Sequence, residues 1–129
     1  MIATGVIGCN FEDQVIGGTG LHPVAVQAAR IAALRSASDH SFINARTDIF
    51  LKAPRTDHNA AMVEEALARG SAYADAGASG LFLPGLADEA LIAQACAAST
   101  LPVNIMATPV VPPRARLAEL GVARISHGP

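Results

Sequence analysis

Residues 42–51, Phe42-Ile-Asn-Ala-Arg-Thr-Asp-Ile-Phe-Leu51, change from apolar to polar and back to apolar over a short stretch. The apolar start predicts a buried strand, and the polar residues after it predict that the strand emerges at one edge of a sheet. In α/β folds, ligands bind at this carboxyl edge. Arg46 would place a planar, permanently charged guanidinium there, which suits a carboxylate or a phosphonate. The alternative is that Arg46 and Asp48 form a solvated ion pair at the strand end.

The same pattern, a short apolar strand followed by a helix, recurs along the chain. Strands are expected at about residues 6–10, from 42, and at 80–83, 102–106 and 122–126, with helices at about 23–35, 60–76, after Asp88 and at 114–120. Within the helices, Gln27 and Arg69 are assigned to water-facing positions, and Gly70 to close packing on the sheet. A helix in every connection predicts a parallel sheet.

Two α/β architectures fit five parallel strands that alternate with helices: an open doubly wound sheet, or an arc of a (β/α)₈ barrel. Neither G-x-G-x-x-G nor G-x-x-x-x-G-K-[ST] follows a strand, so neither a dinucleotide site nor a P-loop is indicated. Polar residues end nearly every predicted strand, which favours a partial (β/α)₈ TIM barrel. A complete barrel needs about 250 residues, whereas this chain has 129.

Composition narrows the class of protein and its partners. The net charge of −2 without a basic stripe argues against a nucleic-acid surface. Cys9 and Cys96 lie far apart, so neither a disulfide framework nor a zinc site is indicated. No signal peptide is visible, and no apolar run approaches the roughly 20 residues that span a bilayer. A cytoplasmic protein with no membrane partner is expected.

Several motifs occur in order and at close spacing. They are Val6-Ile-Gly-Cys-Asn-Phe-Glu-Asp13, Ala28-Ala-Arg-Ile-Ala-Ala-Leu-Arg35, Phe42-Ile-Asn-Ala-Arg-Thr-Asp48, Tyr73-Ala-Asp-Ala-Gly-Ala78, Leu81-Phe-Leu-Pro-Gly85, Pro102-Val-Asn104 and Leu120-Gly-Val-Ala-Arg-Ile-Ser126. Together they resemble the isocitrate lyase/phosphoenolpyruvate mutase family, in its short phosphonomutase-like branch, over nearly the whole chain.

The resemblance implies a (β/α)₈ barrel enzyme that uses Mg²⁺, with Mn²⁺ as the alternative, to make or break a C–C or P–C bond in a small oxo acid or phosphonate. The shared step forms or consumes a pyruvate enolate. By resemblance, Arg46 grips the substrate anion, Asn104 lies near the substrate, and Glu12 binds the metal through water. Asp13 is a weaker metal candidate, with bracing of the following loop as the alternative. No catalytic residue is assigned.

The departures from the family pattern restrict the reaction. Lyase members carry a Lys-x-Cys-Gly-His type loop after the Glu-Asp pair, whereas residues 14–22 here contain no cysteine. Cleavage of isocitrate or methylisocitrate by the usual route is therefore not expected. Some lyases also have a glutamate where this chain has Gly85. By resemblance, residues 1–129 correspond to strands four to eight, a single C-terminal part of the barrel without the metal-binding third strand and the last helix.

An isolated arc of five strands would expose two long edges and, for strands rich in Val, Ile and Leu, an apolar inner face. We therefore expect self-association, giving a homo-oligomer, or marginal stability. Three interpretations stay open: an enzyme or a piece of one, a catalytically silent truncated relative, and a half-barrel module completed by a partner chain. The histidines are expected to be exposed or incidental, with His127 a weak phosphate-binding candidate at the last strand.

Overall fold

The computed structural model describes residues 5–128, which form alternating strands and helices. The elements in chain order are β1 (Gly8–Glu12), α1 (Val24–Ala37), β2 (Phe42–Arg46), the 3₁₀ helix η2 (Arg55–Asp57), α2 (Ala60–Asp75), β3 (Gly80–Phe82), α3 (Glu89–Ala98), β4 (Val103–Ala107), α4 (Arg114–Glu119) and β5 (Arg124–His127). This order agrees with the sequence prediction, except that η2 was not foreseen and β1 extends to Glu12.

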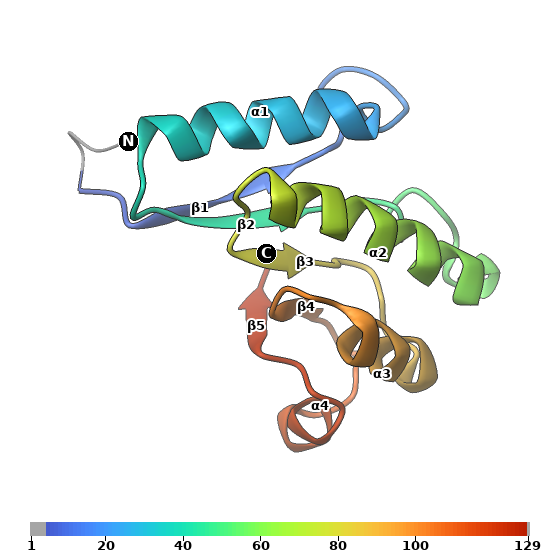
Figure 1. Cartoon of the computed structure of the whole chain (residues 1–129). Helices are drawn as coiled ribbons and strands as arrows, with labels where there is room; N and C mark the ends of the chain where they lie inside the picture. Colours follow the sequence, from blue (N-terminus) through green and yellow to red (C-terminus); the bar gives the residue numbers. More distant parts are fainter. Residues whose placement is uncertain (1–4, 129) are drawn as a thin grey trace.

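The five strands form one parallel sheet in the order β1-β2-β3-β4-β5. Each strand therefore pairs with its neighbour in sequence, and the order never reverses as it would in a doubly wound sheet. Figure 1 shows the sheet curling, with the helices α1 to α4 arranged around its outer side. The fold is a curled half-barrel, which confirms the predicted partial TIM barrel.

The two faces of this sheet differ in chemistry because alternate residues of a strand point to opposite sides. The helix side is apolar: Ile43 and Ala45 pack with Ile31 of α1 and Tyr73 of α2. A larger cluster joins β3 and β4 to the other helices through Leu81, Leu83, Val103, Ile105, Val63, Ile92, Ala95 and Leu117. The Val, Ile and Leu residues of the strands are thus covered by helices.

The expectation of an apolar inner face was therefore wrong. On that face, Asn44 of β2 donates to Asn10 of β1 (Nδ2···Oδ1, 2.8 Å), and Asn104 of β4 donates to Ser126 of β5 (Nδ2···Oγ, 2.8 Å). The apolar members of this face are Phe42, Phe82 and Met106, and Arg124 lies over the Phe42 ring at 4.8 Å. In this half-barrel, strand alternation places Ile43, Val103 and Ile105 against the helices, while several polar residues lie on the inner face.

Close packing and caps fix the helices on the sheet. Gly70 of α2 is buried, and a Cβ there would lie 2.8 Å from Leu81 Cδ2, which confirms the predicted close approach. The predicted cap of α3 is also present, since Asp88 Oδ1 accepts from Leu91 N at 3.0 Å. Asn59 Oδ1 caps α2 in the same way, accepting from Met62 N at 3.2 Å.

No helix within residues 5–128 has the length and apolar character that a bilayer crossing requires.

Candidate functional site

Three of the predicted site residues lie on the inner face in one row across the sheet. The pairing register aligns Glu12 of β1 with Arg46 of β2, Arg46 with Phe82 of β3, and Phe82 with Asn104 of β4. Because register partners on one face are neighbours, Glu12 and Arg46 lie side by side. The structure therefore brings Glu12, Arg46 and Asn104 to the same side of the half-barrel.

Arg46 is held by a two-point contact with Asp48. Its Nε lies 2.6 Å from Asp48 Oδ1, and its Nη2 lies 3.1 Å from Asp48 Oδ2. The Arg46 side chain is 26% exposed, whereas that of Asp48 is fully buried, so the pair is not the solvated one considered above. The Asp48 hydrogen bonds raise the pKa of Arg46 although partial burial opposes this. Within the described residues, Nη1 of Arg46 keeps its hydrogens available for an anion.

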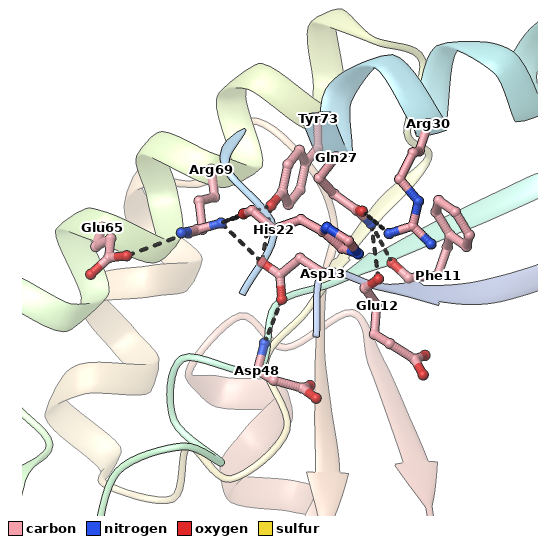
Figure 2. A network of polar contacts seen from close by, with 10 residues as sticks. All are labelled: Phe11, Glu12, Asp13, His22, Gln27, Arg30, Asp48, Glu65, Arg69 and Tyr73. Carbon is pink, nitrogen blue, oxygen red and sulfur yellow. Dashed lines mark hydrogen bonds and ion pairs between the residues drawn. The ribbon is translucent and has the colours of Figure 1, made fainter. Parts of the chain in front are cut away.

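Glu12 is half-buried, and its carboxylate forms no hydrogen bond or ion pair with another residue of the described chain. The main chain at this position is fixed, since Gln27 Nε2 of α1 donates to the Glu12 carbonyl oxygen at 3.1 Å. Figure 2 shows the Glu12 side chain pointing away from the network around Asp13. Glu12 is thus a positioned carboxylate with its oxygens unused, next to a cation.

Asp13 points to the opposite side of the sheet and is fully buried. Its Oδ1 accepts from the Asp48 N–H at 3.0 Å, and its Oδ2 accepts from the Tyr73 hydroxyl at 2.9 Å. Arg69 Nη1 lies 3.3 Å from the same Oδ2 (Figure 2). Both carboxylate oxygens are therefore engaged, and this geometry supports the bracing role over the metal role for Asp13.

Two residues of this region, Arg69 and Gln27, were misassigned from the sequence. Arg69 was expected to face water, but its side chain is only 11% exposed because it reaches Asp13, Tyr73 and the carbonyl of His22. Gln27 was also assigned to the outer face and is fully buried, bound to the end of β1. The signal that could have revealed Arg69 was its spacing of four residues from Tyr73, which places both on one helix face.

The histidines mostly occupy peripheral positions, and one is structural. His58 Nε2 lies 2.9 Å from the Phe50 carbonyl oxygen, and its ring meets the Phe50 ring edge-on at 5.1 Å. That contact fixes the polar loop before α2, so His58 is not incidental. His127 ends β5 and is exposed.

The described residues do not form a complete binding site for a divalent cation. No group of three His, Cys, Asp or Glu side chains is close enough to hold an ion within residues 5–128. Asp13 and Asp48 are occupied by hydrogen bonds, which leaves Glu12 as the carboxylate available at this edge. Magnesium prefers several oxygen ligands in octahedral geometry. These residues therefore do not form a metal centre by themselves.

Comparisons with known proteins agree with this fold. A family model described as phosphoenolpyruvate phosphomutase matches residues 1–129. A "putative phosphonomutase" from Burkholderia cenocepacia J2315 has 53% sequence identity and a TM-score of 0.97, over 99% of this chain and 53% of that one. A 2,3-dimethylmalate lyase structure of the phosphoenolpyruvate mutase/isocitrate lyase superfamily has 27% identity and a TM-score of 0.73, over 97% and 44%.

An uncharacterized protein of Mycobacterium tuberculosis (strain H37Rv) is 34% identical over 121 residues, 94% of this chain and 44% of its own length. The chain thus spans about half the length of the relatives that it matches. The match to the family model extends over all five strands and the candidate site. The chain belongs to the phosphoenolpyruvate phosphomutase family, within the superfamily that also contains the isocitrate lyases.

Proposed function

We propose that this chain supplies the anion-binding side of an active site that makes or breaks a C–C or P–C bond. The substrate would be a small 2-oxo or 2-hydroxy acid or a phosphonate, reacting through a pyruvate enolate. The observation that carries the proposal is the pairing of Arg46 with Glu12 on the inner face. A guanidinium with free donors suits a ligand that carries an anionic group, and the Glu12 carboxylate beside it suits a cation bound together with that ligand.

Arg46 would bind the substrate carboxylate or phosphonate through Nη1, while Asp48 holds the other side of the guanidinium. Asn104 continues the row, and Ser126 fixes the orientation of its amide. On the inner face, the carboxylates of Glu12 and Asp48 carry two negative charges beside the single positive charge of Arg46. This excess of negative charge opposes anion binding, so a cation at this edge would assist it.

We propose Mg²⁺, or Mn²⁺, as that cation, with Glu12 contacting its water shell. Since the described residues do not form a complete metal centre, the remaining ligands would come from a segment or chain outside them. A metal of this kind stabilises enolate charge when bound. The same need supports the second candidate, a half-barrel module completed by a partner chain, and a homo-oligomer that covers the polar inner face. The two free cysteines, Cys9 and Cys96, suit a reducing compartment such as the cytoplasm.

Calorimetric titration with oxalate, a planar dianion resembling a bound enolate, tests the anion site with and without MgCl₂. Arg46→Ala should abolish binding. Because the substitution leaves the buried Asp48 carboxylate without its cation, far-UV circular dichroism of the variant must show that it is folded. Arg116→Ala is the control: Arg116 is also ion-paired, with the carboxylates of Glu89 and Glu119, but it lies on the outer helices. Equal oxalate affinity in wild type and Arg46→Ala would contradict the proposal.

A further inference from the structure

Asp13 is a fully buried carboxylate that lies beside the candidate site. Its side chain accepts hydrogen bonds from three residues, namely Asp48, Tyr73 and Arg69. A carboxylate buried with this many donors is held in one orientation. Its position is therefore a fixed point from which neighbouring groups can be oriented.

That fixed point is connected to Arg46 through the main chain on both sides of Thr47. The Asp13 N–H donates to the Arg46 carbonyl oxygen at 3.0 Å. The Asp13 carboxylate accepts from the Asp48 N–H, also at 3.0 Å. The two peptide groups that flank Thr47 are thus both bound to one residue of the neighbouring strand, which sets the backbone direction where β2 ends.

The backbone of Asp48 in turn determines where its side chain lies. The Asp48 carboxylate is fully buried and forms the two-point contact with Arg46 Nε and Nη2. A two-point contact fixes both the place and the plane of a guanidinium. Arg46 therefore derives its orientation from Asp48, and Asp48 derives its own from Asp13.

The other end of this chain of contacts is anchored on α2. Tyr73, four residues after Arg69, is fully buried, and both side chains reach Oδ2 of Asp13. Arg69 also donates to the His22 carbonyl oxygen at 3.0 Å, at the end of the loop that follows β1 (Figure 2). Helix α2 thus binds the Asp13 carboxylate on the helix side of the sheet, whereas the Arg46 side chain lies on the inner side.

We propose that Asp13 is a positioning residue that orients the anion-binding Arg46 guanidinium through the backbone and side chain of Asp48. The role in anion binding rests on the proposed function above. The orientation of Arg46 itself is a property of the unliganded protein. Asp13 acts on Asp48 through one acceptor, Oδ1, which the amide oxygen of an asparagine can replace. The NH₂ group of that asparagine cannot accept from Arg69 and Tyr73 as Oδ2 does.

The test compares Asp13→Ala, Asp13→Asn and Asp88→Ala by two measurements. Asp88 is the matched control because it also accepts one backbone N–H, at the start of α3. The first measurement is hydrogen exchange of the Arg46 Nε–H by NMR without ligand, its signal assigned by its loss in Arg46→Lys. The second is oxalate affinity by calorimetry.

Asp13→Ala should speed Arg46 Nε–H exchange and weaken oxalate binding by tenfold or more, as expected for losing hydrogen bonds to a charged group. Asp13→Asn keeps the acceptor for the Asp48 N–H but loses the acceptor for Arg69 and Tyr73, so it should lie between wild type and Asp13→Ala in both measurements. Asp88→Ala should lower the melting temperature with neither value changed. Wild-type Arg46 exchange in Asp13→Ala, or equal impairment by Asp13→Asn and Asp13→Ala, would overturn the proposal.

Two further outcomes are informative. If the wild type binds no oxalate while Arg46 exchange still follows the variants, the proposed function fails and the positioning role stands. If Asp13→Ala does not fold, Tyr73→Phe replaces it, since this change removes one donor to Asp13 Oδ2. The Arg46 Nε–H should then exchange faster in Tyr73→Phe than in the wild type, but more slowly than the Nε–H of an unpaired guanidinium. An exchange rate equal to that of the wild type overturns the proposal.

Discussion

Replacing Tyr73 by Phe removes one hydroxyl from a fully buried site and leaves the ring packing intact. The lost hydrogen bond runs to a carboxylate, Asp13, at 2.9 Å, and such bonds contribute about 1.5–3 kcal/mol. Arg69 stays 3.3 Å from the same oxygen, so Asp13 is not left without a partner. We expect Tyr73→Phe to lower the free energy of unfolding at pH 7 by about 2 kcal/mol.

The pH dependence of this difference has a definite sign. Burial, reinforced by the Asp13 carboxylate, raises the pKa of Tyr73 above the ordinary tyrosine value. The stabilisation is complete below the unfolded-state pKa of about 10 and is lost as the pH rises toward the folded-state pKa. Wild type should lose about 1.4 kcal/mol between pH 7 and pH 11, most of it above pH 10, a loss that Tyr73→Phe lacks. The difference of about 2 kcal/mol should shrink to about 0.6 kcal/mol at pH 11.

The assay suits this chain because it contains one tyrosine and no tryptophan. Urea unfolding followed by far-UV circular dichroism at pH 7 and pH 11 gives the two free energies. Absorbance at the phenolate band then reports Tyr73 alone in the folded protein. Ionisation with a midpoint near 10 under native conditions, or equal stability of both proteins at pH 7, would refute the buried hydrogen bond to Asp13.

Two further substitutions test other contacts of the fold by the same urea assay. Gln27→Ala should cost about 1–3 kcal/mol, because Gln27 is buried and binds the carbonyl at the end of β1, whereas Gln94→Ala on the half-exposed face of α3 should cost far less. Gly85→Ala should cost about 1–3 kcal/mol, because Gly85 has φ +88° and a Cβ there would lie 3.1 Å from the Phe50 backbone. Gly20→Ala, with open space around the added methyl group, should leave stability nearly unchanged. Reversed orders within either pair would contradict these contacts.

The element order was predictable because local signals agree with the fold. Asp88 and the glycines after the helices mark element ends, and Ala60–Asp75 has the apolar periodicity of a helix packed on a sheet. The parallel pairing could be predicted because a helix connects each strand to the next. Parallel strands need such a long crossover, whereas antiparallel strands can be joined by a short hairpin. The choice of a barrel arc over an open sheet rested on polar residues at the strand ends, and the sequential strand order bears it out.

The site was predictable only where it follows strand alternation. Glu12 and Arg46 end neighbouring strands with the same parity, so their pairing on one face follows from the register. Asp13 is one residue further along, and one residue reverses the face. The sequence alone could not show that α2 would offer Arg69 and Tyr73 at that point, because the contact joins residues 56 and 60 positions apart. Polar contacts between residues so far apart produce no periodic pattern in the amino-acid sequence.

Gly85 shows how the backbone can account for a departure from the family pattern. Some lyases carry a glutamate at this place in the turn after β3. Here the residue adopts φ +88°, which costs little for glycine and is strained for other residues. The adjacent backbone of Phe50 and Leu51 also lies within 3.2 Å of the position that a Cβ would take. A glutamate at position 85 therefore requires a differently shaped turn.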